Sequence, residues 1–212
     1  MIVAPTKKRA MGSHQSAAMG KDEWLTPPWV LERLGSFDLD PCSPISRPWD
    51  TARQHYSVLD NGLSKQWHGR VWCNPPYGLE AAQWLDRCFA HGNAIALIFA
   101  RTETSMFFRH VWGRADGLLF LEGRLYFHHV TGVRASANSG APSVLVAYGS
   151  ANAECLKNCG IGGAWVGAKE IFVAPKTSPN TQSVQFECSQ CTAVSTNPES
   201  RFCWRCGSGL VE

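Results

Sequence analysis

The sequence predicts an α/β fold with a largely parallel sheet, followed by a small C-terminal unit. Strand-like segments alternate with segments whose apolar residues recur at helical spacing, which is typical of α/β domains. One strand-like segment, "NAIALIFA" at 93–100, is a continuous apolar run, as expected for a strand buried on both faces of the sheet. After Val173 the composition becomes rich in Pro, Ser and Thr, and this change marks the end of the main domain.

The N-terminal part is predicted to be a tail and a first helix. Residues 1–20 have no hydrophobic period, so we expect a flexible tail ahead of a domain that spans 21–173. The helix is predicted to start after Thr26, because prolines are favoured in a first turn and Gly35 stands just past the last apolar position. Pro27 and Pro28 occupy its first turn, and its apolar face carries Trp29, Val30, Leu31 and Leu34.

The remaining elements follow in order along the domain. "FDLD" at 37–40 alternates apolar and acidic residues and then meets a proline, which predicts a short strand ending in a loop. A turn-rich stretch, 43–66, comes next. Ligands of parallel sheets bind beyond the carboxyl ends of the strands, so the loops after 37–40 and 69–73 are expected to face one crevice. Further strands are predicted at 69–73, 93–100, 117–123, 124–130 and 143–149, and helices at 79–92 and 104–112.

Composition narrows the class of protein. A hydrophobic content of 44% and a charged content of 17% are values of a globular chain. The net charge of +3 permits a nucleic-acid partner without arguing for one. No apolar run approaches the roughly 20 residues needed to span a membrane, and "MIVAPTKKRA" lacks the apolar core of a signal peptide. The sequence therefore predicts a soluble, intracellular protein.

Four of the nine cysteines form two tight pairs near the C-terminus. Two C-x-x-C pairs at this spacing are typical of a tetrahedral four-thiolate site, and Zn²⁺ is the expected ion. A unit this short has too few apolar residues for a core of its own, so metal binding would supply its folding energy. We expect a linker at 174–183 and a zinc ribbon at 184–212, with Cys188, Cys191, Cys203 and Cys206 as ligands.

The stretch "NPPY", directly after the strand at 69–73, is the clearest candidate for chemistry. An aromatic amine such as N6 of adenine is a poor nucleophile, because its lone pair is delocalised into the ring. Methylating it requires acceptors for both N–H groups, and the Asn74 side-chain oxygen and the Pro75 carbonyl are two such acceptors. Consecutive prolines, Pro75 and Pro76, fix φ and hold that carbonyl outward. Tyr77 offers a flat face to an extruded base. A proline-rich turn without function is the alternative.

With these residues in view, the sequence resembles a known family. "NPPY" is similar to the catalytic motif of S-adenosylmethionine-dependent amino-methyltransferases. "DEWLTPP", "FDLDPCSP", "DNGLSKQWHGRVWCNPPYG", "ARTETSMFF" and "GRLYF" resemble the DNA N6-adenine methyltransferases of bacteriophages and prophages, from Lys21 to Tyr148. The resemblance implies a Rossmann-like methyltransferase sheet with helices on both faces, in the cytoplasm of a bacterial host. It also implies S-adenosylmethionine as methyl donor, adenine in DNA as target, and catalysis by Asn74, Pro75, Pro76 and Tyr77.

The resemblance also implies a donor site. Thr26 and Pro27 match a segment that holds the carboxylate end of the donor, with Trp24 beside it; an ordinary helix N-cap is the alternative role for Thr26. "DLDPC" takes the place of the donor-binding loop, although the usual glycines are absent from it. An Asp there can bind the ribose hydroxyls or the ammonium group, Asp40 ahead of Asp38, and a plain Asp-Pro turn is the alternative. The expected donor-binding residues are Trp24, Thr26, Pro27, Asp38, Asp40, Pro41 and Cys42.

Three further residues are candidates for DNA contact. Arg101 and Thr102 follow the apolar strand at 93–100, and Arg124 precedes "LYF". Each could contact a DNA phosphate or shape the pocket, and an ordinary solvated side chain is the alternative.

Two other functions fit the same sequence. One keeps the mechanism and changes the amine to N4 of cytosine, N2 of guanine in RNA or a glutamine side chain in a protein. The other is a scaffold without catalysis that binds nucleic acid or a partner through the zinc unit. The missing glycine loop favours this scaffold, and the intact "NPPY" counts against it.

Overall fold

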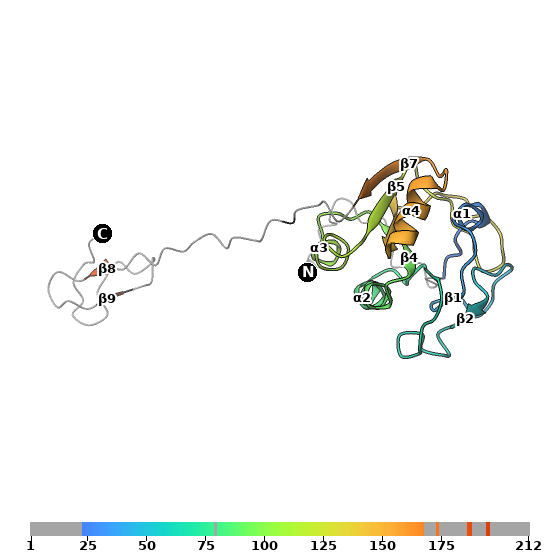
Figure 1. The fold of residues 1–212 in the computed structure, drawn as a ribbon, viewed down its shortest axis with the longest axis horizontal. Coiled ribbons are helices and arrows are strands. Elements are labelled where there is room, and N and C mark those ends of the chain that lie inside the picture. The colour runs from blue at the N-terminus through green and yellow to red at the C-terminus, as the bar shows by residue number, and fades with distance from the viewer. Residues whose placement is uncertain (1–22, 79, 168–172, 174–185, 188–193, 196–212) are drawn as a thin grey trace, which may run out of the picture. The chain divides into compact units, whose positions relative to one another are not determined.

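The computed structural model describes residues 23–78, 80–167, 173, 186–187 and 194–195, and the chain divides into two compact units, Met1–Val173 and Ala174–Glu212. The larger unit contains a seven-stranded sheet and the smaller a two-stranded one. None of the helices in the described part of the chain has the length and apolar content needed to cross a membrane. The helices are α1 (Pro28–Leu34), α2 (Ala81–His91), α3 (Ser105–His110) and α4 (Ser150–Asn158) (Figure 1). The strands are β1 (Leu39–Asp40), β2 (Gln54–His55), β3 (Val71–Cys73), β4 (Ala94–Phe99), β5 (Gly117–Leu121), β6 (Ser143–Tyr148), β7 (Gly163–Gly167), β8 (Phe186–Glu187) and β9 (Val194–Ser195).

The large sheet has the order β2-β1-β3-β4-β6-β5-β7 and is mixed. Strands β2, β1, β3 and β4 pair in parallel, whereas β6 is antiparallel to both of its neighbours and β7 is antiparallel to β5. The prediction of a largely parallel sheet is correct for the first half and wrong for the second. Every residue of β6 is buried, so its apolar pattern resembles that of a parallel strand and does not reveal its direction.

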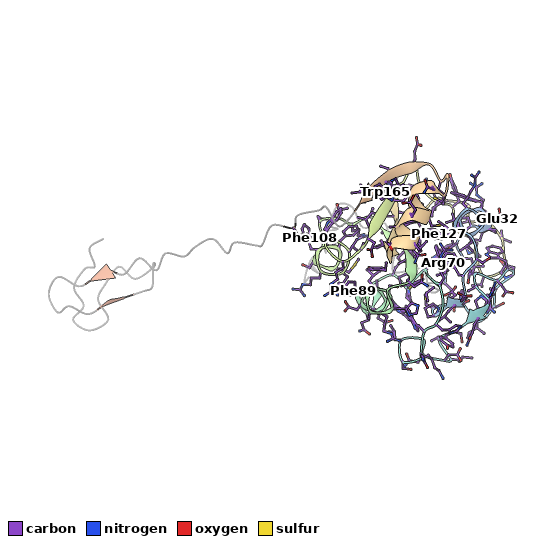
Figure 2. All side chains as sticks on the ribbon, viewed as in Figure 1. Glu32, Arg70, Phe89, Phe108, Phe127 and Trp165 are labelled. Carbon is purple, nitrogen blue, oxygen red and sulfur yellow. The ribbon has the colours of Figure 1, made fainter. Side chains whose placement is uncertain are left out.

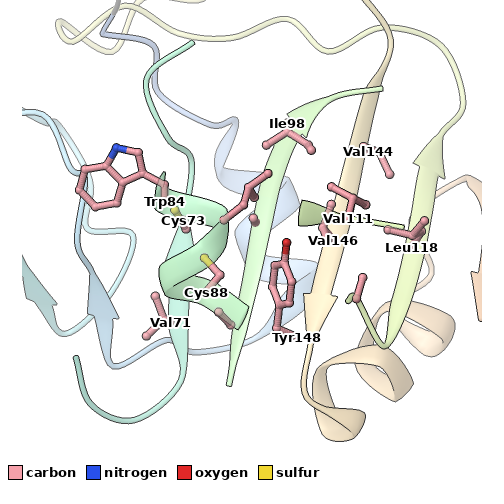
Figure 3. Close-up of a cluster of buried hydrophobic side chains, with 14 of the residues drawn as sticks. Val71, Cys73, Trp84, Cys88, Ile98, Val111, Leu118, Val144, Val146 and Tyr148 are labelled. Carbon is pink, nitrogen blue, oxygen red and sulfur yellow. The ribbon is translucent and has the colours of Figure 1, made fainter. Parts of the chain in front are cut away.

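Helices cover both faces of the sheet, as predicted. On one face, α2 and α3 pack against alternate residues of the central strands, among them Ala96 and Ile98 of β4 (Figure 3). On the other face, α1 and α4 pack against the intervening residues, Ile95 and Leu97 of the same strand. A strand with apolar side chains on both faces therefore lies between two hydrophobic clusters, which accounts for the continuous run in the sequence.

Arg70, labelled in Figure 2, ties the start of β3 to two helices. Its Nε donates to Asn152 Oδ1 of α4 at 2.7 Å, and its Nη1 donates to the carbonyl oxygen of Leu34 at the end of α1 at 2.8 Å. The guanidinium also lies 4.4 Å above the ring of Phe37. These contacts position the strand that leads into "NPPY".

Two further sequence predictions fail in this unit. Residues 124–130 are not a strand: Gly123, at φ 72°, turns the chain away from β5, and His128 pairs with Leu25 and Arg134 only through isolated bridges. Trp29 does not share the buried face of α1, since 47% of its surface is exposed. Three elements that the sequence did not indicate are the short β2, helix α4 and the edge strand β7.

Candidate active site

A cavity of about 500 Å³ lies beyond the carboxyl ends of β1 and β3, where the two loops were expected to meet. Its wall comes from segments far apart in the sequence: 23–26 before α1, 40–44 after β1, parts of 57–63, 74–77 after β3, and the first turn of α2. The sheet brings these segments together because β1 and β3 are parallel neighbours and end at the same edge.

The side-chain amide of Asn74 is held in one orientation. Its Nδ2 donates to the carbonyl oxygen of Trp24 at 2.9 Å, and a carbonyl can only accept, so the nitrogen must face Trp24. The Oδ1 atom is buried and has no hydrogen-bond partner among the described residues. Both Asn74 and Trp24 line the cavity. The site thus contains a fixed, unused hydrogen-bond acceptor.

The rest of the motif also lines the cavity. Within the described residues, no hydrogen bond reaches the carbonyl oxygen of Pro75, and Pro76 is exposed. The ring of Tyr77 is stacked on Phe99 at the end of β4, with centroids 4.2 Å apart and planes 6° from parallel. One ring face is therefore covered. Burial raises the pKa of the Tyr77 phenol well above its ordinary value, so the hydroxyl is neutral.

Asp40 is a buried acidic residue of the cavity. Its carboxylate is almost fully buried and accepts hydrogen bonds from the main-chain N–H of Cys42, at 3.1 Å, and from the Thr51 hydroxyl. Burial raises the pKa of Asp40 from 3.8 to about 6, and the two hydrogen bonds act in the opposite direction. Near neutral pH the group is an anion with a protein donor on each oxygen.

The structure does not bring Asp38 to the cavity. Its carboxylate instead accepts a hydrogen bond from the main-chain N–H of Arg70 at 2.8 Å and lies 3.5 Å from the Arg53 guanidinium. Asp40 lines the cavity and Asp38 does not, although two residues at this spacing would share one face of a regular strand.

Thr26 is not the N-cap of α1, because Pro27 takes that position and makes no side-chain cap. The Thr26 side chain is 2% exposed, lines the cavity, and its Oγ1 has no hydrogen-bond partner among the described residues. Pro27 itself does not line the cavity. The hydroxyl therefore keeps an unused hydrogen-bonding capacity at the cavity wall, and the N-cap interpretation of Thr26 is wrong.

The loop after β1 contributes Pro41 and Cys42 to the wall. Burial raises the pKa of the Cys42 thiol to about 11, and its Sγ lies 3.7 Å from Cys73 Sγ, so the sulfur is a neutral apolar surface here. Gly62 is required beside this loop, because a Cβ there would come within 1.9 Å of the Pro41 carbonyl oxygen.

The three candidate DNA contacts lie away from the cavity wall. Arg124 donates to the carbonyl oxygens of Ser139 and Gly140, at 3.4 and 3.2 Å, and so holds the loop before β6. Arg101 is exposed, and the carbonyl oxygen of Thr102 accepts a hydrogen bond from Trp112 at 3.3 Å. A role for these residues in shaping the pocket is therefore not observed.

Among the lining residues that the sequence did not identify is Trp84. Trp84 lies in the helix predicted at 79–92, where it packs in the core and also lines the cavity. Its indole Nε1 is buried and has no hydrogen-bond partner among the described residues. A helical period identifies a buried face, but it does not reveal whether an indole N–H finds an acceptor.

Several predictions fall outside the described residues: the tail at 1–20, most of the linker and ribbon at 174–212, and the four ligands Cys188, Cys191, Cys203 and Cys206. In the part of the chain that the structure describes, no group of three or more His, Cys, Asp or Glu side chains could hold a metal ion. Strands β8 and β9 are described and pair antiparallel, on either side of the first C-x-x-C in the sequence.

Comparison with known protein families gives a match. A family model described as DNA N-6-adenine-methyltransferase (Dam) matches residues 13–156, which is more than half of the chain. No curated protein and no solved structure matches the chain.

Proposed function

The chain belongs to the DNA N-6-adenine-methyltransferase (Dam) family, and from this premise we propose that residues 74–77 carry the reaction, methylation of the N6 amino group of adenine in DNA. Membership in the family implies S-adenosylmethionine as the methyl donor. The observation that carries the proposal is the state of Asn74: its Nδ2 is bound to Trp24 while its buried Oδ1 is unpaired at the cavity.

That acceptor meets the chemical need of the amine. Asn74 Oδ1 binds one N6 hydrogen and the Pro75 carbonyl binds the other, which turns the nitrogen lone pair out of conjugation with the ring. Both acceptors belong to a turn that two prolines make rigid, so they need no reorganisation as the reaction proceeds. The amine nitrogen then forms a bond to the methyl carbon while the carbon–sulfur bond breaks, its electron pair remains on sulfur, and the surplus proton on nitrogen passes to solvent.

Adenine in duplex DNA is stacked and paired through its N6 amine, so it must leave the helix to reach this turn. Tyr77 offers one ring face to the extruded base, because its other face lies on Phe99. The support from Phe99 keeps the ring in place, and stacking is the contribution we assign to Tyr77.

The cavity also fits the methyl donor. Bound S-adenosylmethionine would supply an electrophilic methyl group on a positively charged sulfur. Thr26 offers an unused hydroxyl to its carboxylate, and Asp40 offers an anion to its ammonium group or ribose hydroxyls. Trp24, Pro41 and Cys42 complete the nearby wall. Asp38 and Pro27 do not line the cavity, so we omit them from the donor site.

The test is methyl transfer to defined oligonucleotides. The full chain is incubated with donor carrying a labelled methyl group and with duplex DNA, and the digested nucleosides are separated. N6-methyldeoxyadenosine is the expected product. Label on cytosine, on guanine of an RNA substrate, or on protein glutamine would overturn adenine as the target. Failure of the chain to bind the donor at all would leave only a scaffold function.

For the C-terminal unit we propose a zinc ion bound by Cys188, Cys191, Cys203 and Cys206. The supporting observations are the spacing of the two C-x-x-C pairs and the antiparallel β8–β9 pair that flanks the first of them. The ion would stabilise this unit, which is too small for a hydrophobic core of its own.

A further inference from the structure

Trp84 carries a hydrogen-bond donor that the protein itself does not use. The side chain is 7% exposed, and its Nε1 has no acceptor among the described residues. Two other tryptophans show the usual arrangement: Trp67 donates to the carbonyl oxygen of Gly62 at 2.9 Å, and Trp112 donates to Thr102 at 3.3 Å. Buried polar groups without partners are few in native proteins, and each calls for an explanation.

The position of Trp84 supplies that explanation. The residue lies in the first turn of α2 and lines the cavity, together with Glu80 and Gln83 of the same turn. In Figure 3 its indole extends away from the other labelled side chains of the cluster. An indole N–H donates and never accepts, so the missing partner must present a lone pair on nitrogen or oxygen.

The wall around Trp84 differs from the wall around Asn74. Cys42 and Leu63 pack against the same cluster as Trp84 and also line the cavity. The chain at Gly62 lies on the edge of the indole, since a Cβ there would come within 3.3 Å of the ring. This part of the wall contains the apolar groups of Trp84, Cys42 and Leu63, and an apolar surface that carries a hydrogen-bond donor suits a purine ring. Thr26 and Asp40 lie in a more polar part of the wall, which suits the charged end of the donor.

We propose that the Trp84 N–H donates a hydrogen bond to a ring nitrogen of the adenine moiety of the methyl donor. The inference rests on the proposed function and extends it: Trp84 binds the adenine ring of the donor, whereas Thr26 binds its carboxylate and Asp40 binds its ammonium group or ribose hydroxyls. Trp84 is a binding residue and takes no part in methyl transfer.

The first test compares two tryptophan variants by calorimetry with S-adenosylhomocysteine. Trp84→Phe keeps an aromatic ring and removes the N–H, and we expect about tenfold weaker binding. Trp49→Phe is the matched control, because the Trp49 Nε1 is also buried and unpaired but does not line the cavity. Its affinity should equal that of the native chain. Native affinity in Trp84→Phe overturns the inference, even if its affinity for DNA falls.

A second test needs no folded variant. Analogues of S-adenosylhomocysteine in which one ring nitrogen, N1, N3 or N7, is replaced by C–H are titrated into the native chain. One analogue should bind the native chain about tenfold more weakly than the parent does. Trp84→Phe, if it folds, should bind that analogue and the parent with equal affinity. If all three bind like the parent, the inference is wrong. If the native chain binds no S-adenosylhomocysteine, the proposed function itself is wrong. If the native chain binds it and methylates DNA, but Trp84→Phe binds it equally well, only this inference is wrong.

Discussion

The side-chain nitrogen of Asn74 donates a hydrogen bond of 2.9 Å to the main-chain carbonyl oxygen of Trp24, fifty positions earlier in the chain. This bond joins the turn after β3 to the segment before α1, and both line the cavity. Because Trp24 contributes a main-chain atom, the contact constrains the path of the chain at position 24 more than the identity of its side chain. The orientation of the Asn74 amide is thus set by the fold.

Replacing Asn74 with Ala should reduce turnover at least about 100-fold, because it removes an acceptor that acts on the amine in the transition state. Donor affinity should stay within about twofold, since Asn74 is assigned to the target base. Asn93→Ala is the control: this amide donates to the Gly69 carbonyl oxygen at 3.0 Å, outside the cavity. Single-turnover rates and calorimetry check both variants, and normal methylation by Asn74→Ala would falsify the mechanism.

Tyr77→Ala should weaken binding of substrate DNA by about 1–3 kcal/mol, the usual contribution of stacking between a base and an aromatic ring. Tyr77→Phe keeps the ring on Phe99 and removes only a hydroxyl that has no partner among the described residues, so it should bind DNA like the native chain. KM for duplex DNA and the fluorescence of 2-aminopurine at the target position measure the effect. Equal losses in the two variants would show that the hydroxyl, and not stacking, matters.

Asp40 predicts a specific dependence of stability on pH. Its pKa is raised from 3.8 to about 6 in the folded chain, so between these values the folded state keeps a proton that the unfolded state has lost. The stabilisation linked to this proton is complete below pH 3.8 and is lost as pH rises through 6, by about 3 kcal/mol in total.

Urea unfolding of the native chain and of Asp40→Asn at pH 4 and pH 7 measures this difference. The asparagine cannot titrate, so the stability of Asp40→Asn relative to the native chain should increase from pH 4 to pH 7. Asp38→Asn is the control, because Asp38 is half-exposed and paired with Arg70 and Arg53. If the free energies of unfolding of Asp40→Asn and the native chain differ by the same amount at both pH values, the prediction is wrong.

The proposed ribbon predicts one zinc ion per chain, detected by elemental analysis of the purified protein. Cys203→Ser should lose the ion, because a four-thiolate site needs all of its ligands. Cys159→Ser, which changes a cysteine of the larger unit, should keep it. Equal zinc content in the two variants would exclude the four-cysteine site.

The sequence was most informative where one physical constraint dominates. The helix at 79–92 was predicted from its apolar period and Gly92, and α2 ends at His91 with Gly92 in the left-handed conformation. The run at 93–100 was predicted as a doubly buried strand and is β4. In both cases local pattern and burial lead to the same element.

Where tertiary contacts decide, the sequence was a poor guide. Residues 124–130 have a strand-like composition, but a glycine turn directs them toward Leu25 instead of along the sheet. β7 is largely exposed at the sheet edge, so it lacks the apolar pattern of an inner strand. Within the site, "NPPY" was predicted from its chemistry alone, whereas the different surroundings of Asp38 and Asp40 appear only in three dimensions.

Leu25 exchanges two main-chain hydrogen bonds with His128, at 2.9 and 3.0 Å, and Leu25 adjoins the carbonyl that orients Asn74. During synthesis on the ribosome, "NPPY" therefore emerges well before the segment that anchors its partner. A nascent chain that has not yet reached residue 128 contains the complete motif but lacks the hydrogen bonds between Leu25 and His128. The Leu25–His128 contact can therefore form only after residue 128 has been translated.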